Sequence, residues 1–86
     1  MPEDPTVAKT LGLINFKRNE FRRAVDLLKE SLGRAKHDPE AQFYLGMAHL
    51  KLGEQAQARE ALRQTVSLDA TGKFAAPAEE TLAELK

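Results

Sequence analysis

The sequence contains no cysteine, no excess of either charge and no long hydrophobic run. Without cysteine, the chain has neither disulfide bonds nor thiolate metal sites. The 13 basic and 13 acidic residues cancel, which argues against a surface that binds nucleic acid or another polyanion. No apolar run approaches the roughly 18 residues of a membrane span, and Met1-Pro2-Glu3-Asp4 does not resemble a signal peptide. We therefore expect no nucleic-acid partner, no membrane partner and a cytoplasmic location.

Residues for catalysis are also scarce. The two histidines are His37 and His49, and His49 is predicted to be a hydrogen-bonded core residue rather than a metal ligand. Glu79-Glu80 and Glu3-Asp4 stand where helices are expected to start, and carboxylates are favourable there. The sequence has no glycine-rich phosphate loop and no other catalytic signature. It predicts a protein that is not an enzyme and has no catalytic residues, cofactor or metal.

The sequence does contain an internal duplication with a period of 34 residues. Shifting the chain by 34 positions aligns identical residues at Pro5 and Pro39, Leu11-Gly12 and Leu45-Gly46, Lys17 and Lys51, Glu20 and Glu54, Ala24 and Ala58, and Leu28 and Leu62. A fixed period of this size is typical of a repeat built from one supersecondary unit. We therefore expect one domain, residues 1–86, with repeats at about 5–38 and 39–72 and a closing segment at about 73–86.

Helix signals recur in the same order in both copies. Asp4-Pro5 and Asp38-Pro39 are N-cap and first-turn pairs. Asn19 and Gly53 suit the left-handed turn that ends a helix. Apolar spacing then predicts helices at about 5–18, 20–35, 39–52, 54–69 and 74–86, with no strand. The fold class is all-α.

The first helix of each unit carries two apolar stripes. In the first copy, one stripe contains Ala8, Leu11, Ile14 and Asn15, and the opposite stripe contains Lys9, Leu13 and Phe16. One apolar stripe suffices to attach a helix to a core, so the second requires another explanation. Gly12 and Gly46 lie inside these helices, where glycine costs about 1 kcal/mol relative to alanine. They predict a close helix–helix crossing.

These residues resemble the tetratricopeptide repeat, whose pattern includes Leu-Gly, a later alanine and an aromatic residue. The matching positions are Leu11-Gly12, Ala24 and Leu28 in the first copy, and Leu45-Gly46, Ala58 and Leu62 in the second. The tryptophan position of the pattern holds Ala8 and Gln42 instead. The resemblance implies an α-solenoid, a right-handed stack of two antiparallel helix pairs plus a C-terminal capping helix. The first helix of each pair would line a concave groove.

By that resemblance, the partner-binding groove comprises Lys9, Leu13, Phe16, Lys17, Phe43, Met47, Leu50 and Lys51. Such a groove suits an apolar or amphipathic segment of a protein or peptide partner, with the lysines facing acidic groups. This predicts a protein–protein interaction module, either a small adaptor or part of a larger scaffold. Two alternatives stay open: neighbouring helices cover the stripe within the fold, or apolar helix faces join two copies in a homodimer. Repeat arrays usually need about three units, which favours a longer parent chain or the homodimer.

Overall fold

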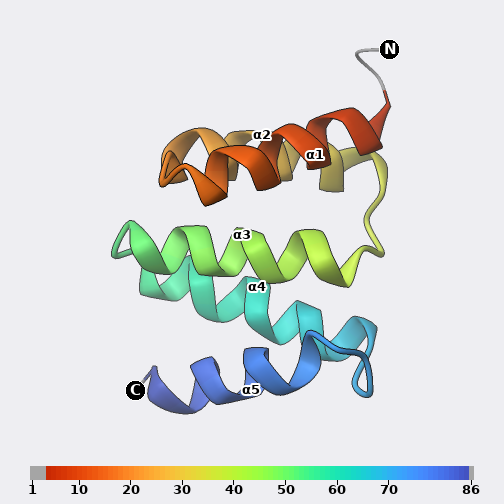
Figure 1. Ribbon diagram of the computed structural model, residues 1–86. Helices are drawn as coiled ribbons and strands as arrows, with labels where there is room; N and C mark the ends of the chain where they lie inside the picture. The colour runs from red at the N-terminus through yellow and green to blue at the C-terminus, as the bar shows by residue number, and fades with distance from the viewer. Residues whose placement is uncertain (1–3, 86) are drawn as a thin grey trace.

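The computed structural model describes residues 4–85, and over these residues the chain forms five α-helices and no strand. The helices are α1 (Pro5–Lys17), α2 (Phe21–Arg34), α3 (Pro39–Lys51), α4 (Gln55–Leu68) and α5 (Ala75–Glu84). Figure 1 shows three layers, in which α1 lies beside α2, α3 lies beside α4, and α5 closes the stack. The predicted all-α solenoid of two helix pairs and a capping helix is confirmed. Glu3 lies outside the described residues, and α5 ends at Glu84, two residues before the predicted helix end.

The helix boundaries follow from local chemistry. The Asp4 carboxylate accepts a hydrogen bond from the Thr6 backbone N–H at 2.8 Å, and the Asp38 carboxylate accepts one from Ala41 at 3.2 Å. Each satisfies a donor that has no partner within its helix. Asn19 and Gly53 have φ angles of 63° and 79°, so both end their helices in the left-handed region as predicted.

The two helices of each pair cross closely at a glycine. A methyl group at Gly12 would lie 2.9 Å from Cγ of Leu28, and one at Gly46 would lie 2.9 Å from Cγ of Leu62. Real side chains do not approach so closely, which means that only glycine permits this separation. Leu28 and Leu62 are both fully buried. The repeated helical glycine therefore allows a leucine to fill each crossing.

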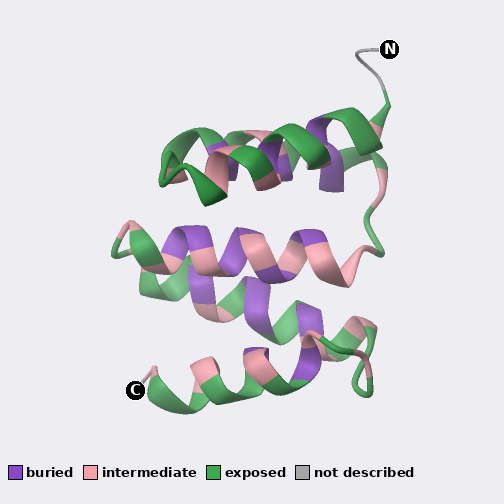
Figure 2. Cartoon of the chain, in the orientation of Figure 1, coloured by how far each residue is buried: buried purple, intermediate pink, exposed green. Residues whose placement is uncertain are grey.

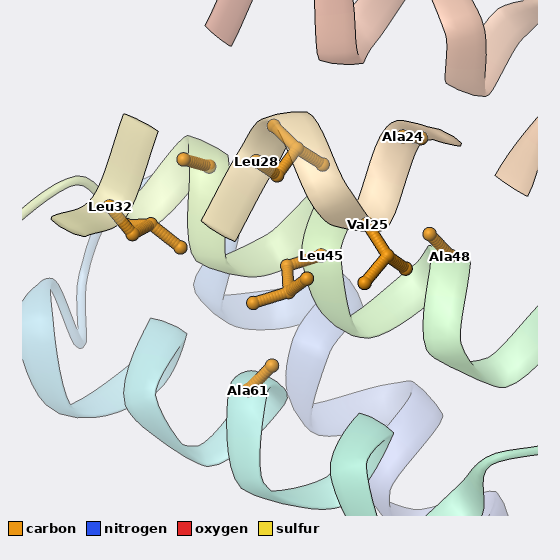
Figure 3. Packing of buried hydrophobic residues seen from close by; sticks show 8 residues of the cluster. Ala24, Val25, Leu28, Leu32, Leu45, Ala48 and Ala61 are labelled. Carbon is orange, nitrogen blue, oxygen red and sulfur yellow. The ribbon is translucent and has the colours of Figure 1, made fainter. Parts of the chain in front are cut away.

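A hydrophobic cluster joins the first helix pair to the second (Figure 3). It contains Ala24, Val25, Leu28 and Leu32 of α2, Ala41, Leu45 and Ala48 of α3, and Ala61 of α4. In Figure 3, Val25 and Leu45 point into the space between their helices. Because residues of α2 pack on α3, the two pairs share one core, as expected for stacked repeats.

The five aromatic residues of the chain form one connected row. Neighbouring ring centroids are 5.2–5.4 Å apart along the order Phe21, Phe16, Tyr44, Phe43 and Phe74. Edge-to-face and tilted pairs at such separations are favourable. The row begins on α2, crosses α1 and α3, and ends beside α5. It therefore links all three layers.

The closing helix α5 covers the second pair. Ala78 is fully buried and belongs to a cluster with Phe43 and Leu62, against which Phe74 and Leu82 also pack. The exposed residues of α5 include Glu79, Glu80 and Glu84. The exposed face of α5 therefore presents three carboxylates to solvent.

Candidate interaction surfaces

The predicted groove residues fall into three groups by exposure. Leu13, Phe16, Met47 and Leu50 are half-buried, Lys17 and Lys51 are exposed, and Lys9 is half-buried. Phe43 is buried, with 9% of its surface exposed. Leu13 and Met47 are equivalent in the two repeats, as are Phe16 and Leu50, so the half-buried apolar side chains repeat along α1 and α3. We call these four residues the concave strip.

Phe43 lies beneath other side chains instead of in the concave strip. Its ring centroid is 5.3 Å from that of Phe74 and 5.2 Å from that of Tyr44. Phe74 precedes α5 and packs against the same cluster as Phe43. The closing helix therefore covers this part of the predicted groove, which agrees with the alternative of packing within the fold. Phe43 is therefore a core residue and does not line the concave strip.

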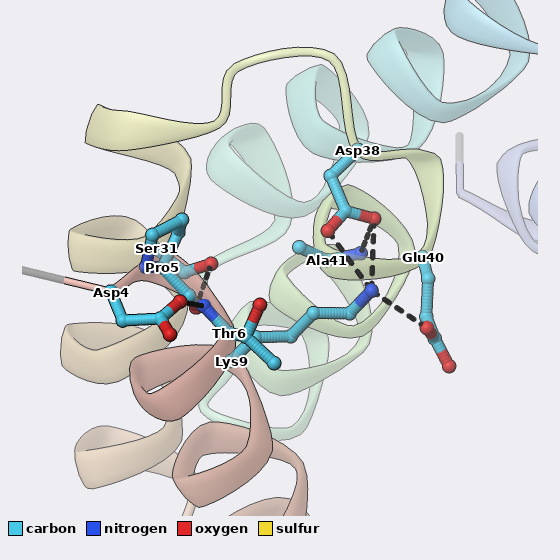
Figure 4. A network of polar contacts seen from close by, with 8 residues as sticks. All are labelled: Asp4, Pro5, Thr6, Lys9, Ser31, Asp38, Glu40 and Ala41. Carbon is cyan, nitrogen blue, oxygen red and sulfur yellow. Dashed lines mark hydrogen bonds and ion pairs between the residues drawn. The ribbon is translucent and has the colours of Figure 1, made fainter. Parts of the chain in front are cut away.

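Lys9 joins the first layer to the second (Figure 4). Its Nζ lies 3.0 Å from Oδ2 of Asp38 and 2.8 Å from Oε1 of Glu40. Burial works to lower the pKa of Lys9, but its hydrogen bonds to Glu40 and Asp38 outweigh burial and raise that pKa. Asp38 also caps α3. Lys9 is therefore engaged by α3 within the fold, unlike the exposed Lys17 and Lys51.

A second polar cluster lies around His49, which is 4% exposed. Nδ1 of His49 is 2.7 Å from Oε1 of Glu54, and the other oxygen of that carboxylate accepts a hydrogen bond from Arg22 of α2. Arg22, and after it His49, hold the pKa of Glu54 below its ordinary value. The predicted hydrogen-bonded core histidine is present. Sequence reasoning missed the bridge because Arg22 and Glu54 are 32 residues apart.

We predict that Glu54→Gln lowers the free energy of unfolding at neutral pH and changes it less at acid pH. The lowered pKa means that the ionised carboxylate stabilises the fold above its unfolded-state pKa, near 4.5. That contribution is lost as the pH falls through the lower folded-state pKa. The urea midpoint of the variant should therefore be lower than that of the parent at pH 7, and the difference should be smaller at pH 3, below the unfolded-state pKa.

Glu20→Gln is the matched control for this prediction. Glu20 occupies the equivalent position in the first repeat, is exposed, and makes no ion pair among the described residues. Its replacement should leave the urea midpoint nearly unchanged at both pH values. Equal effects of Glu20→Gln and Glu54→Gln at pH 7 would contradict the bridge.

Among the residues that the structure describes, the most exposed large apolar side chains lie on the other stripe of α1. Val7, Leu11 and Ile14 are 44%, 44% and 45% exposed. Figure 2 shows much of α1 in green, whereas α3 is mostly purple and pink. The sequence analysis identified Leu11 and Ile14 as one stripe but could not show that this stripe lacks a covering helix. We call these three residues the end face.

An open cleft of about 540 Å³ lies between α2 and α4, over α3. Leu45, His49 and Ala61 are its buried residues. Lys29 and three glutamines are among its polar lining residues. The sequence analysis did not predict this cleft. One signal was available, since Ala61 occupies the position that Leu27 holds in the first repeat.

The described residues contain no evident reactive centre. Within residues 4–85, no group of three or more histidine, aspartate or glutamate residues is placed to hold a metal ion. His37 is exposed, and Nδ1 of His49 is hydrogen-bonded to the carboxylate of Glu54. None of the helices in this part of the chain combines the length and apolar character needed to cross a membrane.

The comparisons with known proteins agree with this architecture. The sequence matches the family model described as tetratricopeptide repeat over residues 9–73. A search against curated proteins gives no match. The family match includes all of α2, α3 and α4 and most of α1. Proteins with these repeats are generally protein–protein interaction modules. The chain belongs to the tetratricopeptide repeat family.

Proposed function

We propose that this chain is a non-enzymatic interaction module that binds an apolar or amphipathic segment of a partner protein along its concave strip. The observation that carries the proposal is the repetition of half-buried apolar residues, Leu13 and Phe16 on α1 and Met47 and Leu50 on α3. Such pairs on two stacked helices suit successive apolar side chains of one extended or helical segment. The module would act as an adaptor or as part of a larger scaffold.

Two exposed lysines give the concave strip its charge preference. Lys17 and Lys51 occupy the last turns of α1 and α3, at equivalent positions in the two repeats. Neither takes part in an ion pair among residues 4–85. A partner segment with acidic residues beside its apolar residues would meet both lysines. We therefore propose an acidic amphipathic partner segment.

The expected affinity is modest. Full burial of an apolar side chain contributes about 1.5–3 kcal/mol, and the four residues of the concave strip are already half-buried. Their remaining contribution is then roughly 3–6 kcal/mol, against association costs estimated at about 4–15 kcal/mol. Contacts from the lysines and the partner backbone must supply the rest. We therefore expect weak binding, with a dissociation constant in the micromolar range or above.

The test is a selection of displayed peptides on the immobilised chain, followed by calorimetry with the synthetic peptides. Leu50→Asp should weaken binding at least tenfold because it places a carboxylate in the concave strip. Leu50 belongs to neither core cluster, so the helical circular dichroism should survive. Lys51→Glu should weaken the binding of acidic peptides and leave the binding of neutral peptides unchanged.

Leu11→Asp provides the matched control, since it introduces the same charge on the end face of α1. It should leave peptide affinity unchanged. The proposal fails if Leu50→Asp and Leu11→Asp reduce binding equally, or if Leu50→Asp has no effect. Selection of peptides without apolar residues would also contradict it.

A further inference from the structure

The end face of α1 is equivalent to a surface that the chain covers elsewhere. A shift of 34 residues places Val7, Leu11 and Ile14 on Ala41, Leu45 and Ala48 of α3. Those three residues are 0–8% exposed because side chains of α2 pack on them. No helix of the described chain occupies the corresponding position over α1. Within the described residues, the end face is therefore a stacking surface that no helix covers.

The opposite end of the stack does not complement this surface. The exposed side chains of α5 include Glu79, Glu80 and Glu84. Placing them against the end face would bring three carboxylates onto apolar side chains with one arginine, Arg18, at the edge, and burying carboxylates that lack a partner is unfavourable. Head-to-tail stacking of copies is therefore disfavoured. A second copy that approaches with its own α1 meets no such obstacle.

The residues of the end face form a self-complementary pattern. Asp4, Val7, Leu11, Ile14 and Arg18 follow one another at alternating intervals of three and four residues, which is the spacing of a two-helix seam. Asp4 and Arg18, at the two ends, are both exposed. The pattern runs from an acidic residue through three apolar residues to a basic residue. An antiparallel copy of the same pattern pairs opposite charges at both ends.

We propose that the end face is a homodimer interface in which α1 of two copies packs antiparallel about a twofold axis. Leu11 meets the partner's Leu11 at the axis, and Val7 meets the partner's Ile14 on either side of it. Asp4 then faces the partner's Arg18 at each end. Such an isologous contact uses one surface patch twice and closes at two copies. It leaves the concave strip outside the contact.

The size of the contact predicts a weak dimer. Thirteen helical residues span about 20 Å, so two such helices bury less than the roughly 800 Å² per partner of a standard interface. We therefore expect a dissociation constant of about 10–100 µM, in rapid exchange with monomer. The unfolding temperature should rise with protein concentration, because dimer formation stabilises the folded state by mass action.

Sedimentation velocity across a dilution series from about 5 µM to 1 mM tests the proposal. The parent chain should shift from monomer toward dimer mass. Leu11→Asp should remain monomeric throughout, because it brings two carboxylates together at the axis. Ala83→Asp, on the exposed surface of α5, is the control and should dimerise as the parent does. A parent chain that stays monomeric at 1 mM, or a Leu11→Asp variant that dimerises normally, would overturn the proposal.

A charge exchange tests the antiparallel arrangement without changing an apolar residue. Arg18→Glu places a carboxylate opposite the partner's Asp4 at both ends and should weaken the dimer about threefold to tenfold. Adding Asp4→Asn removes that repulsion and keeps a good N-cap for α1, so the double variant should regain part of the loss. If Arg18→Glu has no effect, or if Asp4→Asn fails to relieve it, the antiparallel arrangement is wrong. This test also stands if Leu11→Asp fails to fold.

Discussion

Replacing Leu28 by alanine is expected to lower the free energy of unfolding by about 2–5 kcal/mol, the usual cost of emptying a fully buried leucine site. Leu28 has no exposed surface and fills the crossing at Gly12. It also belongs to the cluster that joins α2 to α3. The substitution therefore opens a cavity where the two helix pairs meet. A chain of this length is typically stable by only about 4–13 kcal/mol.

Urea unfolding followed by circular dichroism measures this loss. Leu27→Ala is the matched control, because Leu27 is the adjacent leucine on α2 and is only half-buried. It should cost clearly less, about 1 kcal/mol. Equal losses for the two variants would show that Leu28 is not the packing residue of this junction.

The second large effect is expected from Gly46→Val. The new Cβ would lie 2.9 Å from Cγ of Leu62 and 3.3 Å from the carbonyl oxygen of Ala58. Leu62 is fully buried and cannot move into solvent. Forcing α3 and α4 apart should cost about 3 kcal/mol, the upper end of usual overpacking penalties. This loss exceeds the gain of under 1 kcal/mol from replacing a helical glycine.

Gly33→Ala is the control for this prediction. Gly33 also lies in a helix, but a methyl group there would contact nothing within 4 Å. Its replacement should raise stability by up to about 1 kcal/mol. Thermal unfolding of both variants should therefore shift in opposite directions. A Gly46→Val protein as stable as the parent would show that the helices do not need this close crossing.

Much of the fold could be predicted from the sequence because local chemistry determines where these helices begin and end. Asp4 and Asp38 cap their helices through hydrogen bonds to nearby N–H groups, and Asn19 and Gly53 adopt the left-handed turn. Gly12 predicted the close crossing of two helices, because glycine inside a helix lowers stability and is expected where a larger side chain would not fit. The 34-residue period then predicted the order of the layers, because each repeat forms one helix pair.

The candidate surfaces were harder to predict because they depend on which helix covers which stripe. Angular positions showed two apolar stripes on α1 but not that Leu11 and Ile14 would stay exposed. Phe43 occupies a groove position in the repeat pattern, yet Phe74 covers it from a segment 31 positions away. The cleft over Leu45 arises from the separation between α2 and α4, and no single residue type indicates it.

Mapping the binding site by nuclear magnetic resonance tests the proposed function most directly. An isotopically labelled chain would be titrated with an acidic amphipathic peptide obtained by selection. We expect the shifted signals to belong to the concave strip and its two lysines, namely Leu13, Phe16, Lys17, Met47, Leu50 and Lys51. Signals of Val7, Leu11 and Ile14 should stay in place at constant protein concentration. Shifts confined to the end face, or to the cleft around Leu45 and His49, would contradict the concave strip as the binding site.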